Sequence, residues 1–84
     1  MNLNEAIAKR LNELIEERGI TAYKLYLKSG VSQSTISEIK NMRNKGATLK
    51  ILFELCEGLE IGLSDFFNSP LFERGNIIDW QHKL

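Results

Sequence analysis

The sequence predicts an all-α protein, with a compact domain of five helices followed by a short C-terminal extension. Apolar residues recur every three or four positions, which is the spacing of one helix face. Helix-start signals recur along the chain, and no segment shows sustained alternation of apolar and polar residues. With 84 residues, the chain has room for one small core and is too short for the layered sheet of most enzymes.

The first helix is predicted by apolar residues at helical spacing between residues 3 and 15. Asn2 is placed to cap this helix, and Glu5 three residues later completes a capping box. Arg18 suits the last turn, and Gly19 can take the left-handed conformation that ends a helix.

Three further helices begin with a hydrophobic staple, in which an apolar residue before the cap packs on another beyond it. Gly30 permits the left-handed turn between the first two of these helices. One more helix is predicted from a Thr48 cap to Leu59, and Gly58 is expected to weaken its end. The stapled starts, each written with its cap in the middle, are Ile20-Thr21-Leu25, Val31-Ser32-Ile36 and Ile61-Gly62-Phe66.

The proline at position 70 marks a boundary between a domain of residues 1–67 and an extension of residues 68–84, called here the C-terminal extension. The extension is too apolar for a solvated tail and too short to fold alone. It therefore either packs on its own domain or contacts a second copy of the chain. The candidates for dimerisation are Phe72, Ile77, Ile78 and Trp80.

The net charge of zero hides an uneven distribution of charge along the chain. Residues 21–50 hold six bases against one acid, a net of +5, whereas residues 1–20 carry −1 and residues 51–84 carry −4. A basic block between acidic flanks is typical of a protein with an anionic partner, although a solvated surface has the same pattern.

Other classes of function find no support in the sequence. The single cysteine, Cys56, excludes an internal disulfide and any CxxC motif, and His82 lies far from it in sequence. The glycines form no phosphate-binding motif, and no apolar run approaches the roughly 20 residues that span a bilayer. We therefore expect a cytoplasmic protein without enzymatic activity, metal, cofactor or membrane association.

A segment in the basic block resembles the helix-turn-helix of the lambda-repressor-like (Cro/Xre) family of DNA-binding proteins. The matching features are Leu25, Gly30 in the turn, Val31-Ser32, the opening Gln33-Ser34-Thr35-Ile36-Ser37 of the second helix, and Ile39. The likeness continues through Thr48-Leu49, Leu52, Leu55, Leu59-Glu60-Ile61 and Leu63-Ser64-Asp65-Phe66-Phe67. It covers about residues 3–67, with the motif itself at residues 21–40. The resemblance implies a five-helix fold that binds double-stranded DNA.

The second helix of the motif, at residues 32–40, is then the element expected to enter the major groove. Val31, Ile36 and Ile39 point inward, which leaves short polar side chains outside to reach base edges. Gln33 suits the N6/N7 edge of adenine, and Glu38 can accept from N4 of cytosine. Each of these is also an ordinary residue for an exposed helix. The candidates for base contact are Gln33, Ser34, Ser37, Glu38 and Asn41.

Contacts to the DNA backbone are expected from bases and helix starts around this helix. Thr35 is included, although a hydroxyl at a helix start also commonly bonds to the backbone of its own chain. Lys24 and Lys50 are weaker candidates. The predicted phosphate contacts are Thr21, Lys28, Thr35, Lys40, Arg43, Asn44, Lys45 and Thr48.

The chain departs from the family pattern at several positions. Ala22 stands where a Gln is common, and Tyr26 stands where a small Ala is usual at a helix crossing, so its ring must point sideways or widen the crossing. Lys40 and Met42 replace the Glu and Gly that commonly follow the recognition helix, and Ala47 replaces a proline. These changes affect the loop along the backbone and leave the apolar pattern intact.

Together these features predict a sequence-specific transcriptional regulator, a homodimeric repressor that reads a palindromic operator. The alternative is a protein-interaction module of the same fold, such as an antitoxin subunit whose acidic C-terminal third meets a basic toxin.

Overall fold

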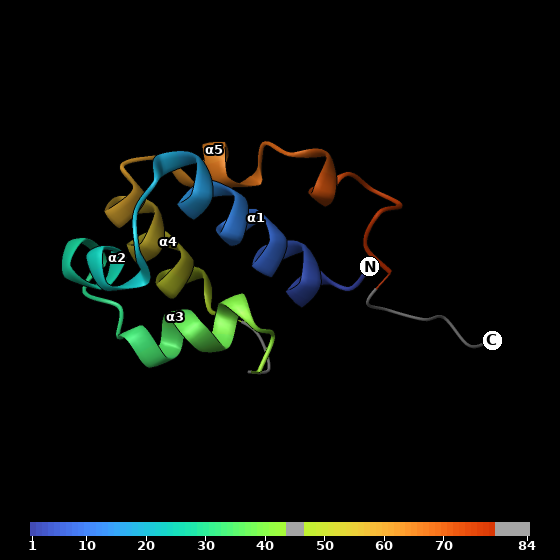
Figure 1. The fold of residues 1–84 in the computed structure, drawn as a ribbon. Coiled ribbons are helices and arrows are strands. Elements are labelled where there is room, and N and C mark those ends of the chain that lie inside the picture. Colours follow the sequence, from blue (N-terminus) through green and yellow to red (C-terminus); the bar gives the residue numbers. More distant parts are fainter. Residues whose placement is uncertain (44–46, 79–84) are drawn as a thin grey trace.

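The computed structural model describes residues 1–43 and 47–78, and every regular element in these ranges is helical. The helices are α1 (Leu3–Arg18), α2 (Ala22–Ser29), α3 (Gln33–Lys40), α4 (Leu49–Leu59) and α5 (Leu63–Phe67). One turn of 3-10 helix, η1 (Pro70–Phe72), follows them. Figure 1 shows α1 running across the molecule, with α3 on one side of it and η1 on the other. The all-α prediction is confirmed.

The helix starts follow the local signals in the sequence. Asn2 accepts from the backbone N–H of Glu5 at 2.8 Å, and the Glu5 carboxylate accepts from the Asn2 N–H at 3.2 Å, which is the expected capping box. Gly19 and Gly30 end α1 and α2 with φ angles of 60° and 79°. The predicted bounds of these two helices are therefore confirmed.

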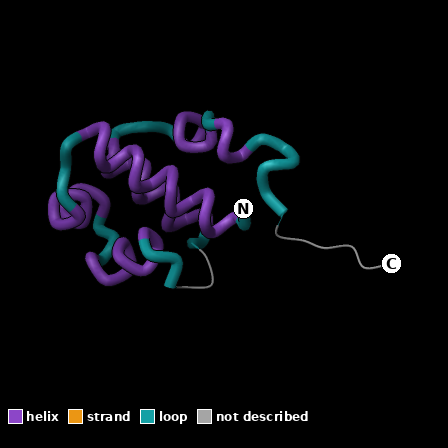
Figure 2. Tube along the Cα trace, turned by 45° about the vertical axis from the view of Figure 1, so that its right-hand side comes forward, coloured by secondary structure: helices purple, strands orange, loops and turns teal. Residues whose placement is uncertain are grey.

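The core lies between α1 and the crossed helices α2, α3 and α4. The backbone arrangement of the helices around it can be followed in Figure 2. In each staple, the apolar residue that follows the cap is fully buried. These residues are Leu25, Ile36 and Phe66. Val31 is buried as well, and Ile20 and Ile61 pack at the edge of the core. Burial of such a side chain stabilises the fold by roughly 1.5–3 kcal/mol, so the staples anchor α2, α3 and α5 as well as directing them.

Gly58 permits a close crossing of α4 and α2. A Cβ atom at this position would lie 2.7 Å from the Cβ of Ser29 and 3.0 Å from a methyl group of Leu25. The backbones could not approach this closely with any larger residue. Gly58 weakens α4 in isolation, as expected, but in the folded chain it brings α2 onto α4.

Arg10 connects α1 to the end of α5. Its Nε donates to the carbonyl of Phe66 and its Nη2 to the carbonyl of Asp65, both at 2.7 Å. These carbonyls lie near the negative end of a helix, where a guanidinium is favourable. The pair of bonds holds α5 against α1.

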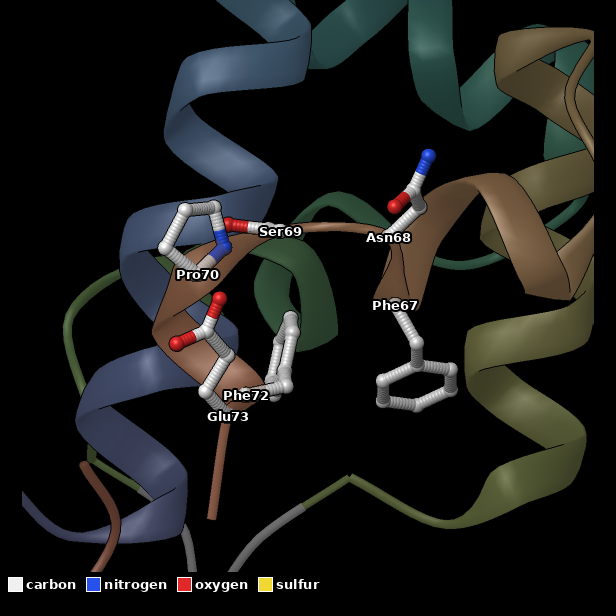
Figure 3. A pocket seen from close by; sticks show the side chains of 6 residues that line it. All are labelled: Phe67, Asn68, Ser69, Pro70, Phe72 and Glu73. Atoms are coloured by element: carbon white, nitrogen blue, oxygen red, sulfur yellow. The ribbon is translucent and has the colours of Figure 1, made fainter. Parts of the chain in front are cut away.

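The C-terminal extension folds back on the domain as far as residue 78. The ring of Phe72 lies 5.0 Å from Phe67 and 6.0 Å from Phe66, measured between ring centroids. Figure 3 shows Phe67 and Phe72 projecting from α5 and η1 into the same space. Farther along, the N–H of Ile78 donates to the carbonyl of Met1 at 3.0 Å. The described part of the extension is thus attached to the domain at two places.

No helix in the described ranges is long and apolar enough to cross a membrane.

Candidate nucleic-acid interface

The packing of α3 sorts its side chains into an inner and an outer set. Ile36 and Ile39 are buried against the core, and Val31 just before the helix is buried as well. The candidate base-reading residues all lie on the remaining surface, with Ser37 half-buried and the others exposed: Gln33, Ser34, Ser37, Glu38 and Asn41. The five side chains therefore lie along α3 and its C-cap, Asn41, while the opposite face of the helix is packed into the core.

Three hydroxyl groups at the start of α3 form a chain of hydrogen bonds. Ser32 caps the helix, with its Oγ accepting from the Thr35 N–H at 3.2 Å. The same hydroxyl donates to the Thr35 Oγ1 at 2.9 Å and lies 3.2 Å from the Ser34 Oγ. Each hydroxyl has one proton, so Ser34 donates to Ser32. The proton of Thr35 then remains available, which suits contact with a phosphate oxygen.

Asn41 and Ser37 are joined at the other end of α3. The Asn41 Nδ2 donates to the Ser37 carbonyl at 2.8 Å and to the Ser37 Oγ at 3.3 Å. Because Ser37 Oγ accepts here, its own proton is available for an acceptor such as O6 or N7 of guanine. Gln33 and Glu38 make no side-chain hydrogen bond to a described residue, so both can turn toward a ligand without breaking one.

Two of the predicted phosphate contacts are helix caps. Thr21 Oγ1 accepts from the Lys24 N–H at 3.0 Å, and Thr48 Oγ1 accepts from the Ile51 N–H at 3.1 Å. Capping uses only the lone pairs of the hydroxyl, so each proton remains free to donate to phosphate. The caps are therefore compatible with the predicted role.

The cationic candidates have different surroundings. Lys28 Nζ lies 3.5 Å from Glu60 Oε1 in an ion pair that links the end of α2 to the end of α4. Lys40 is half-buried beside α1, and Arg43 is exposed after α3. The Arg43 N–H donates to the Glu38 carbonyl at 2.8 Å, which closes the turn that follows α3. Asn44 and Lys45 lie outside the described residues, and so does Trp80 of the extension.

The departures from the family pattern have visible consequences. Tyr26 is partly exposed, with its ring 6.1 Å from that of Tyr23, and a close approach of α2 to α4 lies instead at Ser29 and Gly58. Met42 adopts a left-handed conformation, with φ of 57°, at the position where the resembled family commonly has Gly. A side chain is strained in this conformation by about 1–2 kcal/mol.

The described candidates for dimerisation differ in how far their side chains are exposed. Phe72 packs within the chain, Ile77 is half-buried, and Ile78 leaves 63% of its surface exposed. Of the three described candidates, Ile78 offers the most exposed apolar surface to a second copy.

Outside the α3 surface, the groups to consider for catalysis or metal binding are the Cys56 thiol and any cluster of His, Cys, Asp and Glu in the described ranges. Burial raises the pKa of the Cys56 thiol to about 11, and the nearby carboxylates of Asp65 and Glu57 add to the shift. The thiol is consequently protonated at neutral pH, whereas the thiolate is the nucleophilic form. No cluster of His, Cys, Asp and Glu in the described residues could hold a metal ion.

Comparisons with known proteins place this geometry in a family. A model of the Cro/C1-type HTH DNA-binding domain matches residues 10–70. A comparison with curated proteins found no significant match.

Two solved structures illustrate the similarity. The wild-type restriction-modification controller protein C.Esp1396I is 27% identical with a TM-score of 0.74, over 80% of this chain and 85% of that one. The prophage Lp1 protein 11 is 28% identical with a TM-score of 0.76, over 88% and 99% of the two chains. Together with the matched domain, these likenesses support a DNA-binding transcriptional regulator. The chain belongs to the family of Cro/C1-type helix-turn-helix DNA-binding domains.

Proposed function

We propose that the protein is a sequence-specific transcriptional repressor that binds a palindromic operator as a homodimer, with α3 in the major groove. The observation that carries the proposal is the outer surface of α3, where polar side chains stand on a helix whose inner side is locked into the core. Helices of this kind read base edges with their first turns. The likeness to a restriction-modification controller protein supports a regulatory role.

The donors and acceptors on α3 indicate what the helix would recognise. Ser34 uses its proton within the chain and presents lone pairs, and the carboxylate of Glu38 is an acceptor, so both favour the amino groups of adenine or cytosine. Ser37 has a proton to give and favours guanine or the O4 of thymine. Gln33 suits adenine.

A dimer follows from the small number of bases that one α3 can contact. Two copies would read half-sites about 34 Å apart, which is one turn of DNA. We assign the contact between copies to the C-terminal extension, through Phe72, Ile77, Ile78 and Trp80. Sedimentation of an Ile78→Asp variant tests this assignment without removing Phe72 from the aromatic cluster. A variant that remains a dimer, together with a dimeric chain truncated after residue 68, refutes it.

Selection of bound sequences from a random DNA pool tests the repressor proposal as a whole. We expect enrichment of a palindrome and a log–log salt slope of roughly −7, from about four phosphates per copy at −0.9 each. Gln33→Ala combined with Ser37→Ala should abolish the enrichment and leave the fold intact. A pool without enrichment contradicts the proposal.

A protein-interaction role is a second candidate because of exposed apolar side chains. Several large apolar side chains are exposed on α2 and α4: Tyr23, Tyr26, Leu27, Leu49 and Phe53. Exposed side chains of this size are common at protein interfaces. A partner such as a toxin encoded by a neighbouring gene would bind the Gln33→Ala, Ser37→Ala variant normally and would lose affinity for Phe53→Ser. Operator binding, in contrast, should be lost in the Gln33→Ala, Ser37→Ala variant and retained in Phe53→Ser.

A further inference from the structure

A cleft between α1 and the end of α3 brings together side chains that are far apart in the sequence. It has a volume of about 150 Å³. Figure 1 shows the first turns of α1 next to the end of α3, where the chain continues toward α4. The lining residues are Glu5, Ala8, Lys9, Asn12, Lys40 and Met42.

Asn12 holds the two walls of the cleft together. Its Nδ2 donates to the Ala8 carbonyl at 2.9 Å on α1 and lies 3.4 Å from the Lys40 carbonyl at the end of α3. This donor bridges α1 and α3, which also pack against each other. The position of Lys40 relative to α1 is therefore built into the fold.

The charges in the cleft favour an anion. Lys9 is exposed and Lys40 is half-buried, and neither ammonium group forms an ion pair within the described ranges. Two like charges beside one small cleft repel each other unless an anion lies between them. Glu5 is the acid nearby, but its carboxylate is bonded to the Asn2 N–H at the positive end of α1. Two ammonium groups against this one carboxylate leave the cleft with a net positive charge.

We propose that this cleft receives a phosphate of the DNA backbone, with Lys9 contributing a contact from α1 and Lys40 a contact from α3. The proposal rests on the proposed function, which lays the end of α3 along the DNA backbone. An ammonium binds phosphate as a mobile point charge, so two lysines across a shallow cleft suit a phosphate oxygen on the outside of a duplex. Lys9 thereby extends the contact surface from the motif at residues 21–40 to the first helix.

The salt dependence of binding to a mixed-sequence duplex of about 30 base pairs tests the proposal. Fluorescence anisotropy between about 50 and 200 mM NaCl gives the log–log slope for the full chain and its variants. Lys9→Gln should make the slope shallower by about 0.9 for each bound copy, because one phosphate contact is lost. Lys9→Arg should retain the wild-type slope.

Arg74→Gln is the matched control, since it removes one positive charge from an exposed position in the C-terminal extension, two residues after η1. Figure 1 shows η1 on the opposite side of α1 from α3. It should leave the slope unchanged. Glu5→Gln should strengthen binding, because the amide can still accept from the Asn2 N–H while the negative charge is gone. Thermal melts of the Lys9 and Arg74 variants should agree with that of the wild type, because both side chains are exposed.

The outcomes separate this proposal from the proposed function. If the wild type binds with a steep slope and Lys9→Gln behaves like the wild type, the cleft proposal is wrong and the DNA-binding proposal stands. If Lys9→Gln and Arg74→Gln lower the slope equally, the effect is net charge and the cleft is again excluded. If the wild type shows no binding even at about 50 mM salt, both proposals fail.

Discussion

The helix-turn-helix unit (residues 21–43) and the C-terminal extension are anchored to the domain by different means. The unit inserts Leu25, Val31, Ile36 and Ile39 into the core, each at most 5% exposed. The described part of the extension buries no residue completely and is attached by half-buried Phe72 and a few backbone bonds. A reading helix must keep its orientation to position base contacts, whereas the extension is held by contacts at the edge of the core.

The first prediction measures this difference as free energy of unfolding. Ile36→Ala should destabilise the domain by about 2–5 kcal/mol, because it leaves a cavity at the centre of the core. Phe72→Ala should cost only about 1–2 kcal/mol, since its ring is half-buried and its ring contacts are few. Urea unfolding of the two variants gives both values. Equal losses would show that the extension is as much a part of the core as α3.

The second prediction concerns the close crossing of α2 and α4 at Ser29 and Gly58. Gly58→Ala gains about 1 kcal/mol of helix propensity but forces a methyl group against Ser29, which costs about 1–3 kcal/mol. We expect a net loss of roughly 1 kcal/mol in thermal or urea unfolding. Ser29→Gly in the Gly58→Ala background should be less costly than in the wild type. A purely additive double variant contradicts the close crossing.

The third prediction compares the left-handed residues of the two regions. Gly75 in the extension, with φ of 98°, is a glycine, while Met42 after α3, with φ of 57°, is not. Met42→Gly should stabilise the domain by roughly 0.5–1 kcal/mol, because relief of the strain outweighs the added freedom of the unfolded chain. Met42→Ala is the control, because it keeps the strain and should bring no gain.

These regions also show how far sequence could predict the structure. The caps at Asn2, Thr21, Ser32 and Thr48 were predicted because a cap depends on residues three positions apart. The buried members of each staple followed from the same local spacing.

Contacts between distant segments carried no such signal. The approach of Ser29 to Gly58, the bond from Asn12 to Lys40 and the pair of Lys28 with Glu60 each join residues about 28 or more positions apart. Lys9 belongs to the same class: in the sequence it is one exposed base of a neutral-to-acidic helix, and only the packing of α1 on α3 brings it near Lys40. Folding, and not local pattern, assembles this part of the candidate interface.

The smallest expected effect on stability comes from the ion pair at the edge of the unit. Glu60 holds Lys28 at 3.5 Å, and both side chains are partly exposed to solvent. Glu60→Gln should therefore change the free energy of unfolding by less than about 1 kcal/mol. It should nevertheless raise the affinity for DNA at low salt, because Lys28 no longer has a competing carboxylate and is free to meet a phosphate.

Glu57→Gln separates this local effect from net charge, since Glu57 is exposed one turn earlier on α4 and has no ion pair with a described residue. A general electrostatic effect would raise affinity equally in both variants. If Lys28 contacts the backbone, the gain should be larger for Glu60→Gln and should disappear in the Lys28→Gln background. A gain that survives the loss of Lys28 removes this lysine from the phosphate contacts and leaves the end of α3 and the cleft beside α1 as the basic part of the interface.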